Sequence, residues 1–175
     1  MTKKNCLSML AISMVSLAGS LSAPAAFAQA PQVPAAVAVP GATTIATFQG
    51  VGAQVYECKA GGDGKLAWVF REPIAALIDS GKTVGRHYAG PSWEDVDSSI
   101  ITAKAAGNAP GATSSDIPWL KLDVATHKGH GLFSKVTIVQ RLNTQGGALT
   151  GSCDKAGDFK SVAYAATYVF LRKGK

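Results

Sequence analysis

The side chains best suited to chemistry lie in residues 85–97 (GRHYAGPSWEDVD), around a Gly-Pro turn. This segment combines one histidine with aromatic residues and carboxylates, and the five that we single out are His87, Tyr88, Trp93, Glu94 and Asp97. Aromatic faces provide contact area for a sugar or another flat molecule, and polar groups orient it. The segment therefore predicts a binding surface for a small molecule, a glycan or a protein partner.

Other interpretations of this segment stay open. In one, Trp93 fills the core at a structural corner while Glu94 or Asp97 accepts hydrogen bonds from turn amides. In another, His87, Glu94 and Asp97 form the centre of a hydrolase or a metal-assisted enzyme. The sequence has no G-x-S-x-G nucleophile motif, and sequence spacing does not give the separation of two carboxylates. We expect a non-enzymatic binding module, with the enzyme and a purely structural envelope protein as alternatives.

The remaining histidines, His127 and His130, form an H-x-x-H pattern. A zinc site needs three or four converging ligands. Gly129 and Gly131 place the pair on a loop rather than on one face of a helix. Since no third ligand is set by the spacing, we predict solvent-exposed loop histidines and no metal.

Residues 50–55 (GVGAQV) begin like the dinucleotide-binding pattern G-x-G-x-x-G, but Val55 takes the place of the third glycine. A strand pattern follows, whereas a bound phosphate needs the N-terminus of a helix there. We therefore predict no nucleotide and no other cofactor.

The N-terminus has the three parts of a signal peptide. Lys3 and Lys4 precede a mostly apolar stretch, residues 7–21, and residues 26–28 (AFA) form a cleavage site before Gln29. The apolar stretch is shorter than the roughly 20 residues that span a bilayer, so we predict no membrane span. The expected location is periplasmic or secreted.

Residues 29–42 are rich in proline and alanine, and we expect an extended lead-in outside the core. Residues 43–175 have a length typical of one domain. The whole chain of 175 residues has a formal net charge of +6, with its Lys and Arg residues scattered rather than clustered. A nucleic-acid-binding protein concentrates such residues on one face, so we predict no nucleic-acid partner.

Removal of a signal peptide ending at Ala28 also removes Cys6 and leaves Cys58 and Cys153. An even pair in an exported chain most simply forms one disulfide. The alternative, a reactive or metal-binding thiol pair, has no C-x-x-C motif to support it. We predict a Cys58–Cys153 bridge.

Alternating polar and apolar residues predict strands along most of the mature chain. Residues 54–58 and 65–71 predict a hairpin across the glycine-rich turn 61–64, while residues 74–78 fit either a strand or one helical turn. Further strands are predicted at residues 83–88, 93–96, 100–105, 117–126, 133–142 and 159–171, with a polar loop at 107–116. No segment of 12 or more residues has helical periodicity. This pattern predicts an all-β, single-domain antiparallel β-sandwich or barrel with long loops.

Several motifs also occur in a familiar order: residues 54–58 (QVYEC), 84–94 (VGRHYAGPSWE), 117–120 (IPWL), 136–147 (VTIVQRLNTQGG) and 164–170 (YAATYVF), with Trp68 and Cys153. In these motifs the chain resembles a secreted bacterial and fungal family known as domain of unknown function 3455, over about residues 45–171. The resemblance implies an exported single domain and brings no established activity. Some fungal relatives carry a malate dehydrogenase label, and the missing third glycine argues against that activity here.

Overall fold

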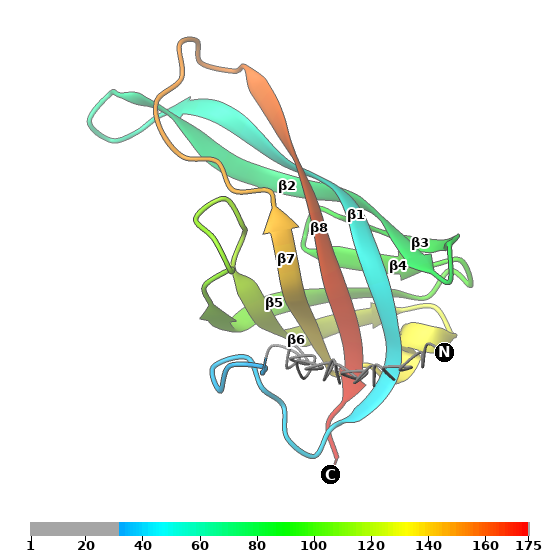
Figure 1. The fold of residues 1–175 in the computed structure, drawn as a ribbon. Helices are drawn as coiled ribbons and strands as arrows, with labels where there is room; N and C mark the ends of the chain where they lie inside the picture. Colours follow the sequence, from blue (N-terminus) through cyan, green and yellow to red (C-terminus); the bar gives the residue numbers. More distant parts are fainter. Residues whose placement is uncertain (1–31, 175) are drawn as a thin grey trace, which may run out of the picture. The chain divides into compact units, whose positions relative to one another are not determined.

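A computed structural model describes residues 32–174, and the predicted signal peptide, residues 1–28, lies outside this range. The elements in chain order are β1 (Thr43–Ala60), β2 (Leu66–Asp79), β3 (Lys82–Tyr88), β4 (Ser92–Asp95), β5 (Ile100–Ala109), β6 (Trp119–Lys128), the 3₁₀ helix η1 (Leu132–Lys135), β7 (Ile138–Gly146) and β8 (Phe159–Arg172) (Figure 1). The fold is all-β, which confirms the class predicted from alternation. Within residues 32–174, no helix is long and apolar enough to cross a membrane.

The strands form one antiparallel sheet that closes on itself. Each strand pairs with the next along the chain, and β8 pairs with β1 to complete a closed barrel. The sequence left a sandwich and a barrel open, and this pairing decides between them. Closure leaves no free sheet edge between β1 and β8, where an open sheet would expose unpaired backbone groups.

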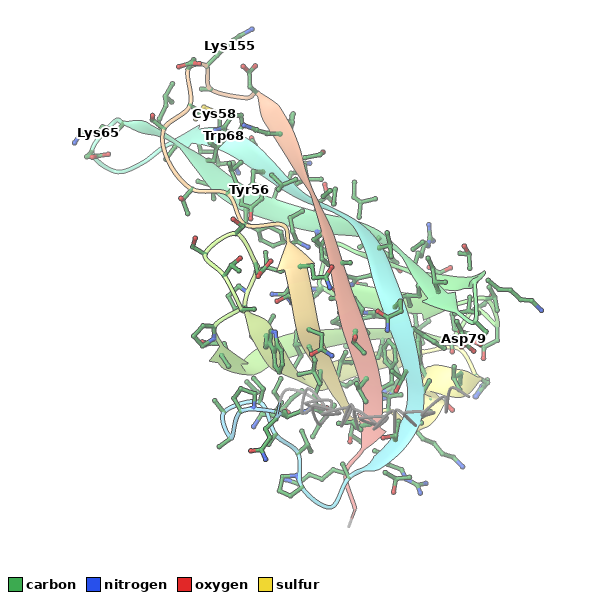
Figure 2. All side chains as sticks on the ribbon, in the orientation of Figure 1. Tyr56, Cys58, Lys65, Trp68, Asp79 and Lys155 are labelled. Atoms are coloured by element: carbon green, nitrogen blue, oxygen red, sulfur yellow. A yellow bond between two sulfur atoms is a disulfide. The ribbon has the colours of Figure 1, made fainter. Side chains whose placement is uncertain are left out.

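β1, β2 and β8 are the longest strands, and their ends extend past the other strands as a three-stranded arm (Figure 1). We define the arm as residues 56–60, 66–70 and 159–161. The predicted disulfide is confirmed: Cys58 in the arm is bonded to Cys153, with their Cα atoms 5.9 Å apart. Figure 2 shows Cys58 and Trp68 in the arm. The bridge therefore fixes the loop between β7 and β8 against the arm.

The far end of the barrel lumen is closed by η1. The Phe133 ring is fully buried and stacks on Phe170 with 4.5 Å between ring centroids. Two side chains from the β4–β5 turn hold this turn of helix: Asp97 Oδ2 accepts from the Leu132 amide at 2.7 Å, and Ser99 Oγ accepts from the Phe133 amide at 3.1 Å. We call this region, residues 97–99 and 132–136 with Phe170, the sealed end.

β1 begins at Thr43, well before the strand that alternation predicts at residue 54. Alternation did not predict this part of the strand because it contains Gly50 and Gly52, and glycine has a low strand propensity. In the structure both glycines are required by close approach. A side chain at Gly50 would overlap the Tyr168 ring, and one at Gly52 would overlap the backbone of β2.

Three other segments refine the sequence prediction. The expected strand at residues 133–142 starts as η1 and becomes β7 only at Ile138. β5 continues to Ala109, into the segment expected to be a polar loop. Residues 74–78, which were ambiguous, belong to β2.

The N-terminal lead-in packs on the outside of the barrel, although its composition suggested a segment outside the core. Val37 is fully buried and clusters with Ala109, Trp119 and Leu142. The Gln140 side-chain amide donates to the Val37 carbonyl at 2.6 Å. The buried Val37 side chain and this hydrogen bond therefore connect the lead-in to β5, β6 and β7.

Candidate functional site

A cavity of about 330 Å³ lies where the lumen meets the arm. Its walls include Phe70 and Pro73 of β2, His87 of β3, Pro91 of the β3–β4 turn and Arg141 of β7. β7 is not adjacent to β2 or β3 in the ring of strands, so Arg141 reaches the cavity from another wall of the barrel. We call this cavity and its lining residues the mouth.

Arg141 brings a positive charge into the mouth. Its Nε and Nη2 atoms donate to the Pro118 carbonyl at 3.1 and 2.9 Å. No carboxylate of residues 32–174 forms an ion pair with it. Burial raises the pKa of Tyr168 well above its ordinary value, and the nearby Arg141 charge opposes that rise. The guanidinium is therefore half-buried, close to the lumen hydroxyls and without a counter-ion.

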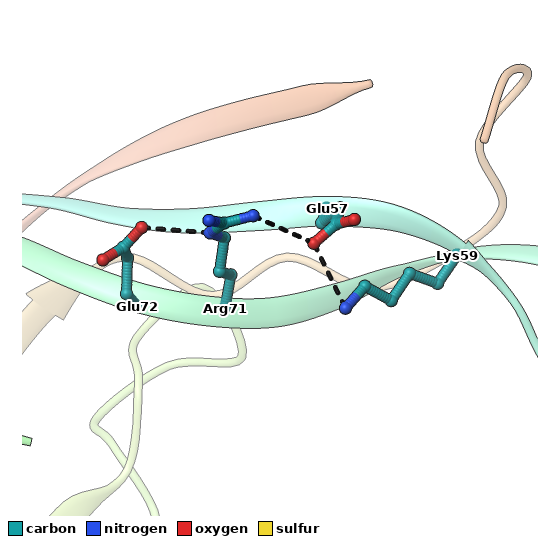
Figure 3. A network of polar contacts seen from close by, with 4 residues as sticks. All are labelled: Glu57, Lys59, Arg71 and Glu72. Atoms are coloured by element: carbon teal, nitrogen blue, oxygen red, sulfur yellow. Dashed lines mark hydrogen bonds and ion pairs between the residues drawn. The ribbon is translucent and has the colours of Figure 1, made fainter. Parts of the chain in front are cut away.

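Arg71, the other arginine at the cavity, is neutralised. Its Nη1 lies 3.2 Å from Glu57 and its Nε lies 3.0 Å from Glu72, while Lys59 shares Glu57 at 3.1 Å (Figure 3). These four side chains form one network along β1 and β2. The positive charge available to a molecule in the mouth is consequently that of Arg141.

His87 is a buried, neutral hydrogen-bond acceptor. Its Nδ1 lies 2.8 Å from the Ser92 carbonyl, and because a carbonyl only accepts, Nδ1 carries the proton and Nε2 keeps a free lone pair. Burial lowers the pKa of His87 to about 4, and the bond to Ser92 only partly opposes this. The ring stacks on Trp93 at 4.4 Å and meets Tyr168 edge-on at 5.1 Å. These contacts fix the orientation of the imidazole.

Polar groups continue from the mouth into the lumen. The Tyr164 and Tyr168 hydroxyls lie 3.0 Å apart, and the Tyr56 hydroxyl donates to the Gly147 carbonyl at 2.7 Å. Trp93 Nε1 is buried with no hydrogen-bond partner in the described chain, and the Gln54 side chain lies beside the Tyr164 hydroxyl. Buried polar groups are normally paired, so this end of the lumen retains hydrogen-bonding capacity that the protein itself does not use.

The five residues predicted from segment 85–97 occupy three different places. His87 and Trp93 are cross-strand partners that both point into the lumen. Tyr88 and Glu94 lie with Arg86 on the other face of the same hairpin, where Arg86 Nη2 is 2.7 Å from Glu94. The alternation of a strand places neighbouring residues on opposite faces, which separates the two groups.

Asp97 lies at the sealed end, away from the mouth, where it accepts hydrogen bonds from Ser99 and Leu132. The trio His87, Glu94 and Asp97 is thus not brought together. His127 and His130 are both exposed, as predicted, but His127 lies in β6 rather than on a loop, with its Nε2 2.7 Å from the Val136 carbonyl. Across the part of the chain that is described, no group of three or more His, Cys, Asp or Glu residues could hold a metal ion.

Sequence reasoning missed Arg141, and it also missed Phe70, Arg71 and Pro73 of β2 as lining residues of the mouth. A signal was present, because Arg141 has the same parity as Val139 in the alternating strand and therefore shares its face. Val139 is fully buried in the lumen core. A charged residue that lies two positions after a core residue in the same strand shares its inward face, and this pattern could have identified Arg141.

Comparison with known proteins gives one result. The model of a family described as "Protein of unknown function (DUF3455)" matches residues 39–172. No curated protein and no solved structure matches the chain.

Proposed function

The chain belongs to the DUF3455 family of unknown function, and from the geometry of the mouth we propose that it is a module that binds a small organic molecule. The observation that carries the proposal is the convergence of Arg141 and His87 on one cavity of about 330 Å³. Small-molecule sites are concave and mostly apolar, with a few polar groups that set orientation. Phe70, Pro73 and Pro91 supply the apolar part here.

The lining of the mouth supports binding over hydrolysis. None of the described residues that line it carries a hydroxyl, a thiol or a carboxylate. A hydrolase built on His87 would need such a group nearby as a nucleophile or as a second acid–base residue. The Tyr164 and Tyr168 hydroxyls lie in the lumen rather than in the lining of the mouth, and burial raises the pKa of both, which disfavours the ionised form. Glu94 and Asp97, the partners expected in the enzyme hypothesis, lie on the hairpin's other face and at the sealed end.

We further propose that the protein works outside the cytoplasm, as a periplasmic or secreted protein. The leader pattern of residues 1–28 and the Cys58–Cys153 bridge support this, because disulfides persist in oxidising compartments. Mass spectrometry of the envelope and culture-medium fractions should find a chain that begins at Gln29. An intact N-terminus on protein retained in the cytoplasm would contradict it.

The binding proposal is tested by an NMR screen of the oxidised protein against a library of small neutral, anionic and cationic molecules. We expect hits that perturb the amide signals of Phe70, His87 and Arg141. The Arg86→Met variant is the matched control, since it removes an arginine from the outer face of the hairpin, and it should leave these hits unchanged. A library without hits, or hits confined to other surfaces, would overturn the proposal.

A further inference from the structure

The unpaired charge of Arg141 is the strongest indication of what the mouth binds. The ion pairs among residues 32–174 use Lys59, Lys65, Arg71 and Arg86, and none uses Arg141. A half-buried charge without a counter-ion is costly because low-dielectric surroundings solvate it poorly. An anion in the mouth would remove that cost.

The geometry of the Arg141 guanidinium indicates which kind of anion would fit the mouth. Nε and Nη2 both donate to the Pro118 carbonyl, which fixes the orientation of the planar guanidinium. The N–H groups that do not point at Pro118 are therefore also fixed in direction. A planar carboxylate matches two neighbouring guanidinium N–H groups. A single arginine balances one negative charge, which fits a carboxylate better than a doubly charged phosphate.

The hydrogen bonding of His87 indicates a second group that the ligand must carry. Its Nδ1–H is used by Ser92, so the imidazole has only the Nε2 lone pair left and can accept but not donate. A complementary molecule must therefore present a hydroxyl or N–H donor to this atom. The stack on Trp93 holds the ring in place, so the acceptor is pre-positioned.

The apolar residues that line the mouth indicate the shape and size of the rest of the ligand. Phe70 is half-exposed and is held edge-on against Tyr56, with 5.8 Å between ring centroids. With Pro73 and Pro91 it gives flat, rigid apolar surfaces that suit a ring. A cavity of about 330 Å³ lies near the lower limit for small-molecule sites, which indicates a compact molecule.

We propose that the mouth binds a small cyclic carboxylate that also carries a hydroxyl or N–H donor. Its carboxylate binds Arg141, its donor binds Nε2 of His87, and its ring packs on Phe70, Pro73 and Pro91. This inference rests on the proposed function of the mouth as a binding site and adds the chemical class of the ligand.

The experiment measures the affinity of a matched panel by calorimetry or NMR titration. The probes are 3- and 4-hydroxybenzoate, benzoate, the neutral 4-hydroxybenzamide and the cationic 4-hydroxybenzylamine. We expect at least one hydroxybenzoate to bind most tightly, and the amide to bind roughly tenfold more weakly because it loses a charge-assisted hydrogen bond. Benzoate, which lacks the donor, should be intermediate, and the amine should be the weakest.

Variants test the assignment of residues. Arg141→Met should abolish the preference for carboxylate over amide, and Arg141→Lys should keep part of it. His87→Phe retains a flat ring but no acceptor, so hydroxybenzoate and benzoate should become equal. Arg86→Met should match the wild type, and a thermal melt of each variant shows that it is folded.

Two kinds of failure are distinguishable. If the amide or amine binds as well as the hydroxybenzoates, or if Arg141→Met and Arg141→Lys both keep the wild-type preference, the carboxylate assignment is overturned while the mouth stays a binding site. The assignment also fails if only unrelated neutral or cationic molecules bind the mouth. If no small molecule of any charge binds there, the proposed function fails as well.

Discussion

The two ends of the barrel lumen differ in how far their polar side chains are paired within the protein. At the sealed end, Asp97 and Ser99 each accept a backbone amide of η1, and Phe133 fills the space between them and Phe170. At the mouth, Arg141 has no counter-ion in the described chain, and the Nε2 of His87 keeps a free lone pair because only Nδ1 is bonded to Ser92.

The hollows at the two ends also differ in charge. A surface hollow beside η1 contains the carboxyl groups of Asp79 and Asp95, whereas the mouth contains Arg141. Burial raises the pKa of Asp95, and the amide of Asp97 only partly offsets this. Of these two hollows, the mouth is the one that contains an arginine without a counter-ion.

This difference separates stability from recognition. Paired groups at the sealed end lower the free energy of the folded state, whereas unpaired groups at the mouth raise it. A protein keeps such groups where function uses them. Substitutions at the sealed end should therefore mainly change stability, and substitutions at the mouth should mainly change binding.

The largest stability effect is expected for Phe133→Ala at the sealed end. Removing a fully buried aromatic ring leaves a cavity and should lower the free energy of unfolding by about 3–5 kcal/mol. Urea denaturation followed by circular dichroism measures it. Phe70→Ala at the mouth is the matched control and should cost less than half as much, because Phe70 is half-exposed. Equal losses would remove the distinction between the two ends.

The disulfide comes next. Replacing both Cys58 and Cys153 by serine should lower the free energy of unfolding by about 2–4 kcal/mol, since the bridge spans 95 residues of chain. The bridge fixes the arm, and β2 supplies Phe70 and Pro73 to the mouth. We therefore expect weaker ligand binding in the double variant, measured at a temperature where it is folded. Unchanged binding would show that the arm does not shape the mouth.

Asp97→Asn should have a smaller effect, of about 1 kcal/mol, because the carboxylate at this exposed position accepts amide hydrogen bonds that solvent can replace. Bonds from the Ser99 side chain and from the amides of Leu132 and Ser99 hold the pKa of Asp97 below its ordinary value. A lowered folded-state pKa stabilises the protein above the ordinary carboxyl pKa, and this contribution disappears as pH falls through the lowered value.

Unfolding curves at several pH values check that prediction. The difference between wild type and Asp97→Asn should be constant at neutral pH and should shrink in acid. A difference that grows on acidification would contradict the role of the carboxylate at the sealed end.

The smallest stability effect is expected for Arg141→Met. The variant loses the two hydrogen bonds that Arg141 donates to the Pro118 carbonyl, but it also loses the cost of a half-buried charge that pairs with no carboxylate in residues 32–174. Because these two changes oppose each other, the free energy of unfolding should stay within about 1 kcal/mol of the wild-type value. Chemical denaturation without ligand measures this. A loss comparable to that of Phe133→Ala would show that Arg141 is a structural residue.

Sequence patterns predicted most of the fold. Alternation identified most of the strands from residue 54 onward, although it left residues 74–78 ambiguous and placed η1 in a strand. The cysteine count predicted the Cys58–Cys153 bridge. They missed the first part of β1, because Gly50 and Gly52 are unfavourable in isolated strands and are needed only where Tyr168 and β2 approach. Whether the strands close as a barrel depends on the long-range pairing of β1 with β8, which no local pattern contains.

The candidate site was harder to predict. Density of functional side chains identified His87, but the same segment also contributed Tyr88, Glu94 and Asp97, which the structure places elsewhere. Arg141 lies far from His87 in sequence and faces the same cavity only because the barrel closes. A site assembled across a lumen depends on topology, so neighbouring residues in sequence are a poor guide to it.

The position of a small carboxylate in the mouth, between Arg141 and His87, can be measured directly. Intermolecular nuclear Overhauser effects between the oxidised protein and the hydroxybenzoate that binds most tightly report which residues surround the ligand. We expect contacts from the ligand ring protons to Phe70 and His87. Contacts to Tyr88 on the outer face of the hairpin, or to Leu132 at the sealed end, with none to Phe70 or His87, would contradict it.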